Sequence, residues 1–279
     1  MVKKIVRPAY RVYMAFLVKW MSVNKKLVRG MPRGLYALSQ FFEKWNEDYT
    51  NISLPEKNLK FITPNWLTKY RAETFFSKEP ETLEWIRGFQ EGETLWDIGA
   101  NVGIFSLFAA SQGTKVTAFE PSPLNLEILS RNILINDFEN YITYVPLALG
   151  NKTGSTKIYM SRENFRVGGA HNSINLPKDQ YGGVLEDPFE ISVLTLTIDK
   201  CCEFFNLEKP THIKIDVDGC ELDVLEGARG VLTQVKSILV ENYPQNKDSE
   251  RVCEILLKSG LREKEIVKAN SANQLWVRG

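Results

Sequence analysis

Apolar and polar positions alternate in strand-like and helix-like patterns along most of the chain. The clearest example is the apolar run over 95–98 (LWDI), which leads into a turn with Gly99 and Gly103 four residues apart. The stretch 104–110 then has helical composition and no breaker. We predict a strand, a tight turn and a helix here. Glycines let a turn approach a ligand closely, and the helix N-terminus offers unpaired N–H groups.

Similar patterns recur on both sides of this unit. Strands are predicted over 115–119, 141–145, 156–160, 212–215, 237–240 and 274–278, and helices beginning near 123, 222 and 252. Ser122 is the expected N-cap of the first of these helices, with Pro123 at its first position. Upstream, 61–64 and 66–68 are predicted as short extended pieces and 79–86 as a helix with acids in its first turn. The chain therefore has the organisation of an α/β domain.

The spacing of the central turn indicates which nucleotide it suits. A dinucleotide fingerprint requires G-x-G-x-x-G, but Asn101 stands where its second glycine would be. An acid, Asp97, closes the strand two residues before Gly99. The next strand ends at Glu120, about twenty residues on, where a carboxylate can hold two ribose hydroxyls.

The motif Asp97-x-Gly99-Ala-Asn101-x-Gly103, followed by Phe119-Glu120-Pro121, resembles class I methyltransferases that bind S-adenosylmethionine, specifically the FkbM family. The resemblance covers roughly 60–277. It implies an α/β, Rossmann-like class I fold with a seven-stranded, mostly parallel sheet and helices on both faces. The residues that it implies for cofactor binding are Asp97, Gly99, Asn101, Gly103 and Glu120, with Ala148 at the adenine edge and Asp216 near the methyl group.

A second motif runs over 214–221 (KIDVDGCE) and again predicts strand, acid-rich turn and helix. Ligands of open α/β sheets bind beyond the carboxyl ends of the strands, so Asp216 and Asp218 should face the cofactor. Lys214 points to the same side as Asp216 and can keep its carboxylate ionised. We predict that Asp216, assisted by Lys214, orients or deprotonates an acceptor hydroxyl, with His171 of a glycine-rich loop as a further candidate base. For Asp218 the alternative is capping of the next helix.

Glu241 and Asn242 end the following predicted strand. If that strand neighbours the one ending at Asp216, the three side chains meet as oxygen groups. Catechol O-methyltransferase and related macrolide-sugar enzymes look similar here and bind magnesium with groups after the same two strands. The resemblance thus implies a Mg²⁺ site at Asp216, Glu241 and Asn242, while a reaction without metal stays open.

The segment before residue 45 differs from the rest. It contains no acid before Glu43, and the charges between 10 and 29 fall within an arc of roughly 120° on a helical projection. The segment is too interrupted to span a bilayer and has no clear signal-peptide cleavage site. We predict a helical extension over 1–45, a bridge or lid segment over 46–93 and a methyltransferase domain over 94–279. The extension either folds onto that domain as a helical cap or oligomer contact, or lies on an anionic membrane surface.

The whole chain is nearly neutral, with 35 Lys and Arg against 34 Asp and Glu, and its four cysteines have neither zinc nor disulfide-scaffold spacing. We expect a cytoplasmic protein, with peripheral contact at the inner face of the membrane as an option. No basic stripe indicates a nucleic-acid partner.

The predicted activity is transfer of a methyl group from S-adenosylmethionine to a hydroxyl oxygen of a sugar, glycan or secondary metabolite. Two alternatives from other classes stay open. One is a nucleoside-binding or membrane-associated partner protein without catalysis. The other is an RNA ribose methyltransferase, because Lys214 and Asp216 form part of the residue set of such enzymes.

Overall fold

The described part of the chain is organised around one seven-stranded sheet. The computed structural model describes residues 49–55, 57–161, 166–169, 173–174, 183, 188–266 and 272–279. His171 and the predicted extension over 1–45 lie outside these ranges. No helix within them is long and apolar enough to cross a bilayer.

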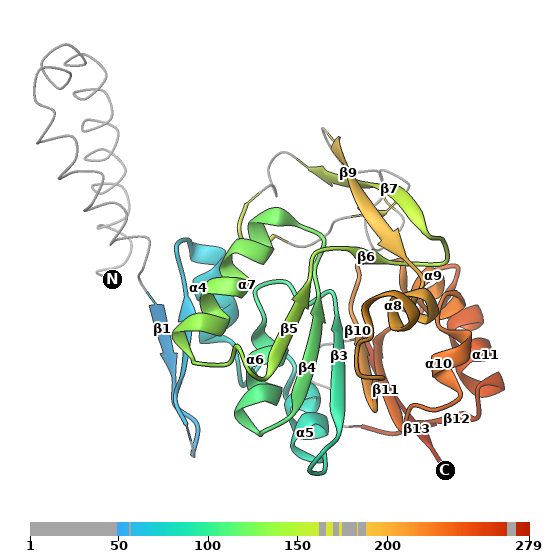
Figure 1. Ribbon diagram of the computed structural model, residues 1–279, viewed down its shortest axis with the longest axis horizontal. Coiled ribbons are helices and arrows are strands. Elements are labelled where there is room, and N and C mark those ends of the chain that lie inside the picture. Colours follow the sequence, from blue (N-terminus) through green and yellow to red (C-terminus); the bar gives the residue numbers. More distant parts are fainter. Residues whose placement is uncertain are drawn as a thin grey trace, which may run out of the picture. The chain divides into compact units, whose positions relative to one another are not determined.

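The large sheet has the strand order β12-β13-β11-β10-β3-β4-β5 (Figure 1). Its strands are β3 (Thr94–Ile98), β4 (Lys115–Phe119), β5 (Ile142–Val145), β10 (His212–Ile215), β11 (Ser237–Glu241), β12 (Leu261–Lys264) and β13 (Asn273–Arg278). The neighbours from β11 to β5 pair in parallel, whereas β13 is antiparallel to both β11 and β12. This arrangement confirms the predicted seven-stranded, mostly parallel sheet.

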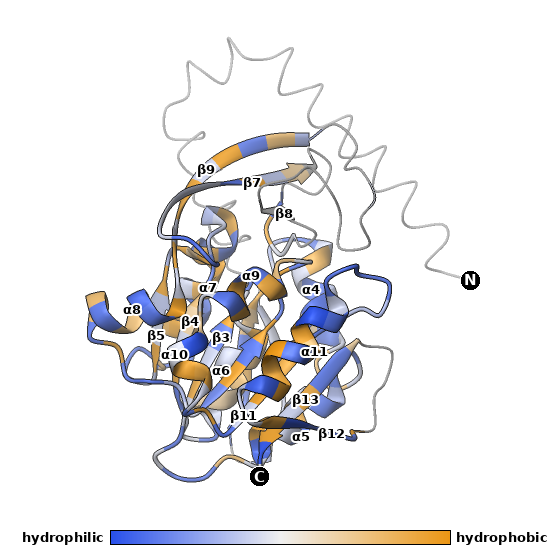
Figure 2. Ribbon diagram, turned by 90° about the vertical axis from the view of Figure 1, so that its right-hand side faces the viewer, coloured by the Kyte–Doolittle hydropathy of each residue, from blue (hydrophilic) through white to orange (hydrophobic). Residues whose placement is uncertain are grey.

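Helices cover both faces of this sheet. They are α4 (Trp66–Glu73), α5 (Pro80–Arg87), α6 (Ile104–Ser111), α7 (Pro123–Ile135), α8 (Ile198–Phe205), α9 (Glu221–Glu226), α10 (Arg229–Leu232) and α11 (Ser249–Lys258). Alternate residues of β3 enter two separate cores, because successive side chains of a strand point to opposite faces. Leu95 packs with residues of α5, α6 and α7, whereas Trp96 and Ile98 pack with α8 to α11. Figure 2 shows the matching mixture of hydrophobic and hydrophilic residues along α11, which buries Val252 and Leu256.

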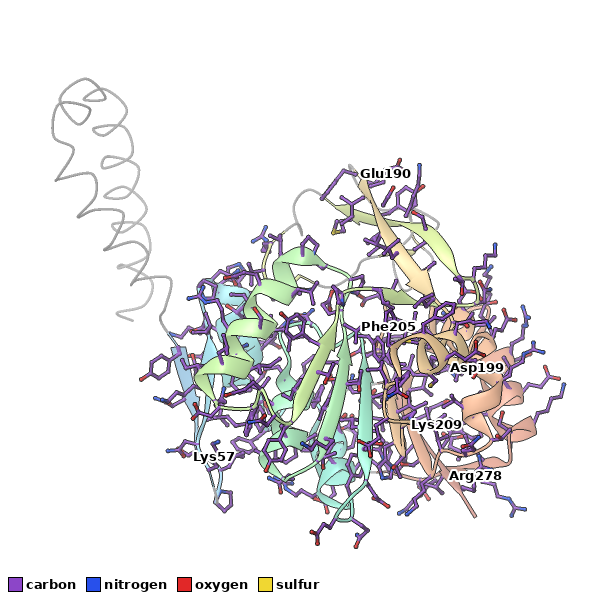
Figure 3. The ribbon with its side chains drawn as sticks, in the orientation of Figure 1. Lys57, Glu190, Asp199, Phe205, Lys209 and Arg278 are labelled. Atoms are coloured by element: carbon purple, nitrogen blue, oxygen red, sulfur yellow. The ribbon has the colours of Figure 1, made fainter. Side chains whose placement is uncertain are left out.

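Two smaller sheets flank the large one. β1 (Tyr49–Ile52) pairs with β2 (Leu59–Ile62), and a four-stranded sheet contains β6 (Ala148–Leu149), β7 (Gly154–Ser161), β8 (Ser173–Ile174) and β9 (Pro188–Leu196). β7 and β9 form a long antiparallel pair beyond the carboxyl ends of the parallel strands, and Glu190 lies on β9 (Figure 3). Arg278 of β13 lies at the other end of the large sheet, far from this pair (Figure 3). The predicted extra strand over 156–160 is thus part of a second sheet.

Two local predictions were wrong. Residues 66–68 begin helix α4 instead of forming an extended piece, because Asn65 accepts hydrogen bonds from the backbone of Leu67 and Thr68 while Thr68 reciprocates in a capping box. The apolar spacing from Leu222 to Leu232 predicts one continuous helix, but α9 ends at Glu226 and the chain resumes as α10. A Cβ at Gly227 would lie 2.1 Å from the carbonyl oxygen of Gly150, so the chain passes another loop closely at the break.

Gly99 is required by a close approach between two strands. Its φ is +87°, and a Cβ there would lie 1.8 Å from the carbonyl oxygen of Asp216. We expect Gly99→Ala to lower the free energy of unfolding by more than about 3 kcal/mol, since both backbone strain and a clash with rigid backbone arise. Urea unfolding would measure the loss.

Gly113 provides the matched control, because its φ is also +87° but nothing lies within 4 Å of its added Cβ. Gly113→Ala should therefore cost only the strain of the left-handed conformation, about 1–2 kcal/mol. Equal losses in the two variants would contradict the importance of the close approach.

Candidate active site

A cavity of about 340 Å³ opens at the carboxyl ends of β3, β4, β10 and β11. This is where ligands bind in open α/β sheets, and the volume lies in the range typical of cofactor sites. One end of the cavity has apolar walls from Phe119, Leu147, Ala148, Leu149 and Ile158, and the other end has charged side chains.

The turn after β3 is anchored to β4 through its own backbone donors. The N–H groups of Gly99 and Ala100 both donate to the carbonyl of Phe119, and that of Asn101 donates to Glu120 Oε2 at 2.8 Å. The N–H of Val102 is taken by Asn101 Oδ1. These four donors of the turn are thus occupied within the protein.

Glu120 is held rigidly at the apolar end of the cavity. Its Oε1 accepts from the Ser122 N–H at 2.8 Å and its Oε2 from Asn101, while the residue is 5% exposed. Burial raises the pKa of Glu120 to about 7, against the lowering effect of these backbone hydrogen bonds. Each carboxylate oxygen keeps acceptor capacity toward the cavity, as required for holding the two hydroxyls of a ribose.

The affinity for S-adenosylhomocysteine should depend on the ionisation of Glu120. Raising the pH from 6 to 8 converts this carboxyl group from mostly protonated to mostly ionised, since its pKa is about 7. Affinity should rise about tenfold over that interval, because the ionised form accepts from both hydroxyls. Titration calorimetry at several pH values would measure this.

Glu120→Gln should bind more weakly and with an affinity that does not change over this interval. Glu127→Gln on α7 is the control, since the Glu127 side chain is exposed and pairs with Arg131 on the same helix. A pH dependence retained in Glu120→Gln would assign the titration to another group.

Asparagine side chains tie a short segment over 166–169 to the cavity wall. Asn101 and Asn125 both donate to the carbonyl of Gly169, at 2.9 and 3.2 Å, and Asn125 accepts from the N–H of Gly168. Arg71 Nε donates to the carbonyl of Gly168 at 2.9 Å. Asn101 thus lines the cavity, as predicted, while its amide mainly holds this segment.

A buried lysine lies at the polar end. Lys214 is 2% exposed, its Nζ donates to Asp216 Oδ2 at 2.9 Å, and it lies over the ring of Phe105. In the β3–β10 register it is the direct neighbour of Asp97. Burial alone would lower the pKa of Lys214, but the charges of Asp216, Glu79 and Asp97 raise it, so the ammonium is retained.

The three carboxylates around Lys214 differ in environment. Burial would raise the pKa of Asp216, but Lys214, with Lys78, lowers it to about 2. Glu79 also has a lowered pKa, because Lys214 and Lys78 outweigh its burial. Burial raises the pKa of Asp97, whose Oδ2 accepts from Ser106 while its Oδ1 is buried without a hydrogen-bond partner in the described structure.

Glu241, at the end of β11, also lines the cavity. Burial and the neighbouring Asp216 charge raise its pKa to about 9, and Tyr243 Oη donates to its Oε1 at 2.9 Å. At neutral pH this site therefore pairs an ionised carboxylate, Asp216, with a protonated one.

The predicted magnesium ligand set is not assembled. Asn242 follows Glu241 on the strand, so its side chain points to the opposite face, where its amide donates to Gln274 Oε1 at 3.1 Å and lies against Cys253. The Asp216 carboxylate is already paired with the Lys214 ammonium at 2.9 Å. In the described ranges no group of three His, Cys, Asp or Glu side chains is arranged to hold a metal ion.

Some of the other predicted residues line the cavity, and the rest lie behind its wall. Gly99, Asn101, Glu120, Ala148 and Asp216 line the cavity. Asp97 and Lys214 lie behind it, and Gly103 packs on α7, since a Cβ there would lie 2.5 Å from Leu129.

The cavity residues that were not predicted as site residues include Arg71, Lys78, Glu79, Asn125 and Tyr243. Glu79, the acid before Pro80, was predicted only as part of a helix start. Nothing in the local pattern indicated that this helix begins beside β10.

Counted in chain order, the strands of the large sheet are arranged 6-7-5-4-1-2-3, with only the seventh reversed. This order, the acid-ended β3 and the carboxylate that closes β4 define a class I methyltransferase dependent on S-adenosylmethionine. A model of the methyltransferase FkbM domain matches residues 97–263, and the chain belongs to that family.

Similar proteins carry methyltransferase names. The hexuronic acid methyltransferase AglP of Haloferax volcanii is 27% identical over 181 residues, covering 65% of this chain and 68% of that protein. The methyltransferase sdnD of Sordaria araneosa is 29% identical, covering 53% and 65%. A crystal structure of methyltransferase FkbM from Methylobacillus flagellatus KT aligns with a TM-score of 0.47 at 18% identity, covering 76% of this chain and 52% of that one. The chain thus spans about half to two thirds of these relatives.

Proposed function

We propose that the protein transfers the methyl group of S-adenosylmethionine to a hydroxyl oxygen of a sugar or glycan. The observation that carries this proposal is the ionised Asp216 carboxylate, facing the cavity at the end opposite Glu120 and backed by a buried lysine. The name of the relative AglP, a hexuronic acid methyltransferase, supports a sugar acceptor.

The residues of the cavity fit this cofactor. Glu120 suits the ribose hydroxyls, and the apolar walls around Ala148 suit the adenine ring. The anionic Asp216 would stabilise a positively charged sulfonium group nearby. The cofactor supplies an already activated methyl group, so the protein has to align the acceptor and manage one proton.

Asp216 is the group that binds the acceptor hydroxyl. Its pKa near 2 keeps it ionised, so it accepts a hydrogen bond from the hydroxyl and orients the oxygen lone pair toward the methyl carbon. The Asp216 carboxylate would then accept the hydroxyl proton as the oxygen takes the methyl group. Glu241 remains protonated under the same conditions and can donate a hydrogen bond to a second acceptor oxygen. Lys214 acts through Asp216, whose charge and orientation it maintains.

The proposal is tested by incubating the full chain with methyl-labelled S-adenosylmethionine and glucose, glucuronic acid, galacturonic acid or glycans that contain them. Label that survives mild alkali identifies a methyl ether and supports transfer to a hydroxyl. Label released by alkali identifies a methyl ester on a carboxyl group and contradicts it. Transfer to RNA alone, or to no acceptor although the nucleoside binds, would favour the two alternatives predicted from the sequence.

A further inference from the structure

Arg71 differs in its ion pairing from the other cations at the polar end of the cavity. Lys214 is paired with Asp216 at 2.9 Å, and Lys78 with Glu79 at 2.8 Å. Arg71 also lines the cavity, yet no carboxylate of the described residues lies within 4 Å of its guanidinium. Unlike Lys214 and Lys78, Arg71 therefore has no ion-pair partner among the described residues.

The guanidinium of Arg71 is oriented, although no carboxylate of the described residues pairs with it. Its Nε donates to the buried carbonyl of Gly168 at 2.9 Å, which fixes the plane of the group. Within the described ranges, neither terminal nitrogen of Arg71 donates a hydrogen bond. An oriented guanidinium with both terminal nitrogens available matches the two oxygens of a carboxylate.

The charges around Arg71 also favour an anionic ligand. Its positive charge acts to lower the pKa values of both Lys78 and Asp216, so the three groups lie within electrostatic range of one another. Arg71 and Lys78 repel each other, and a further anion bound beside Arg71 would reduce this repulsion. The nearby carboxylates Glu79 and Asp216 make a singly charged carboxylate a better match than a doubly charged phosphate.

We propose that Arg71, supported by Lys78, forms a carboxylate-binding site at the polar end of the cavity. The inference rests on the proposed function for the identity of its ligands. Two sources supply this chemistry there: the carboxylate of the methionyl part of the cofactor, and the carboxylate of an acidic sugar acceptor.

Binding measurements on the full chain separate the two sources. Titration calorimetry would compare S-adenosylhomocysteine with 5′-methylthioadenosine, which lacks the amino-acid group. D-glucuronate and D-glucose would then be titrated into the complex with S-adenosylhomocysteine. The variants are Arg71→Gln and Arg71→Lys, and Lys69→Gln is the control, because Lys69 is exposed on the same helix and pairs only weakly with Glu73 at 3.9 Å.

If the cofactor supplies the carboxylate, Arg71→Gln should weaken S-adenosylhomocysteine binding about 10- to 100-fold and leave methylthioadenosine within about threefold. If the acceptor supplies it, both nucleosides should bind unchanged, and the variant should lose a preference for glucuronate over glucose that the wild type shows. Arg71→Lys should restore part of the affinity in either case, since it keeps the charge but not the paired geometry.

Other outcomes overturn the inference. An equal loss for both nucleosides would mean that Arg71 only holds the segment at Gly168. Unchanged binding of both nucleosides together with no preference for glucuronate would remove the site altogether. Failure of the wild type to bind either nucleoside would instead contradict the proposed function, and is thereby distinguishable.

Discussion

Asp216→Asn is expected to lower kcat by about 10²- to 10⁴-fold, the range that a group handling a proton in the transition state contributes. Asparagine keeps the shape of the side chain but removes its negative charge. The acceptor hydroxyl then loses its hydrogen-bond acceptor, and Lys214 loses its nearest counter-charge at 2.9 Å. Affinity for S-adenosylhomocysteine should change far less than kcat, because Glu120 and the apolar walls remain. Single-turnover kinetics and calorimetry measure the two quantities.

Asp218→Asn is the matched control for this variant. Asp218 lies two residues further along the same turn with a φ of +54°, a conformation that asparagine tolerates well. Its kcat should stay within about tenfold of the wild type if Asp216 alone handles the hydroxyl. Similar losses in both variants would point to the charge of the turn as a whole, and a kcat of Asp216→Asn near that of the wild type would remove Asp216 from catalysis.

Lys214→Met should produce the largest loss of stability. The side chain is 2% exposed and provides the buried positive charge beside Asp216, Glu79 and Asp97. Removing one partner of a buried charge pair usually costs about 3–5 kcal/mol, because the remaining charge is left buried and uncompensated. Urea unfolding at pH 7 would report the change in free energy.

The pH dependence gives this prediction a second readout. The pKa values of Asp216 and Glu79 are lowered in the folded protein, so the stability that they contribute is present above their unfolded values and is lost as the pH falls through their folded ones. The deficit of Lys214→Met should accordingly be largest near neutral pH and shrink below about pH 4.

Lys258→Met is the control, since Lys258 is 74% exposed and pairs with Glu254 within one helix. Its effect should remain within about 0.5 kcal/mol. A deficit of Lys214→Met that does not change with pH would show that lost packing, and not lost charge compensation, causes the instability.

The central sheet and the strand-end residues that line the cavity could be predicted from the sequence because their signals are local. Each parallel strand is a short apolar run, and Gly99 and Glu120 follow such runs directly. Parallel strands that alternate with helices end at one edge of the sheet, so residues that close β3, β4 and β10 had to meet there. That reasoning needed no knowledge of side-chain directions.

Predictions that depended on side-chain direction or on distant partners were less successful. Asn242 is adjacent to Glu241 in sequence, but strand alternation turns it to the opposite face toward Cys253. Glu79 and Lys78 belong to a helix start more than a hundred residues before β10, and they reach the site only because α5 packs on that face of the sheet.

The sequence by itself thus determined the fold, the family and the strand ends that line the cavity, since these follow from hydrophobic periodicity and from residues at strand ends. The tertiary structure decided how the charges are distributed. It surrounds the Lys214 ammonium with three carboxylates, leaves Glu241 protonated, and holds Arg71 by its Nε without a carboxylate partner in the described ranges. These properties arise from burial and from distances between segments far apart in the chain, which no local pattern contains.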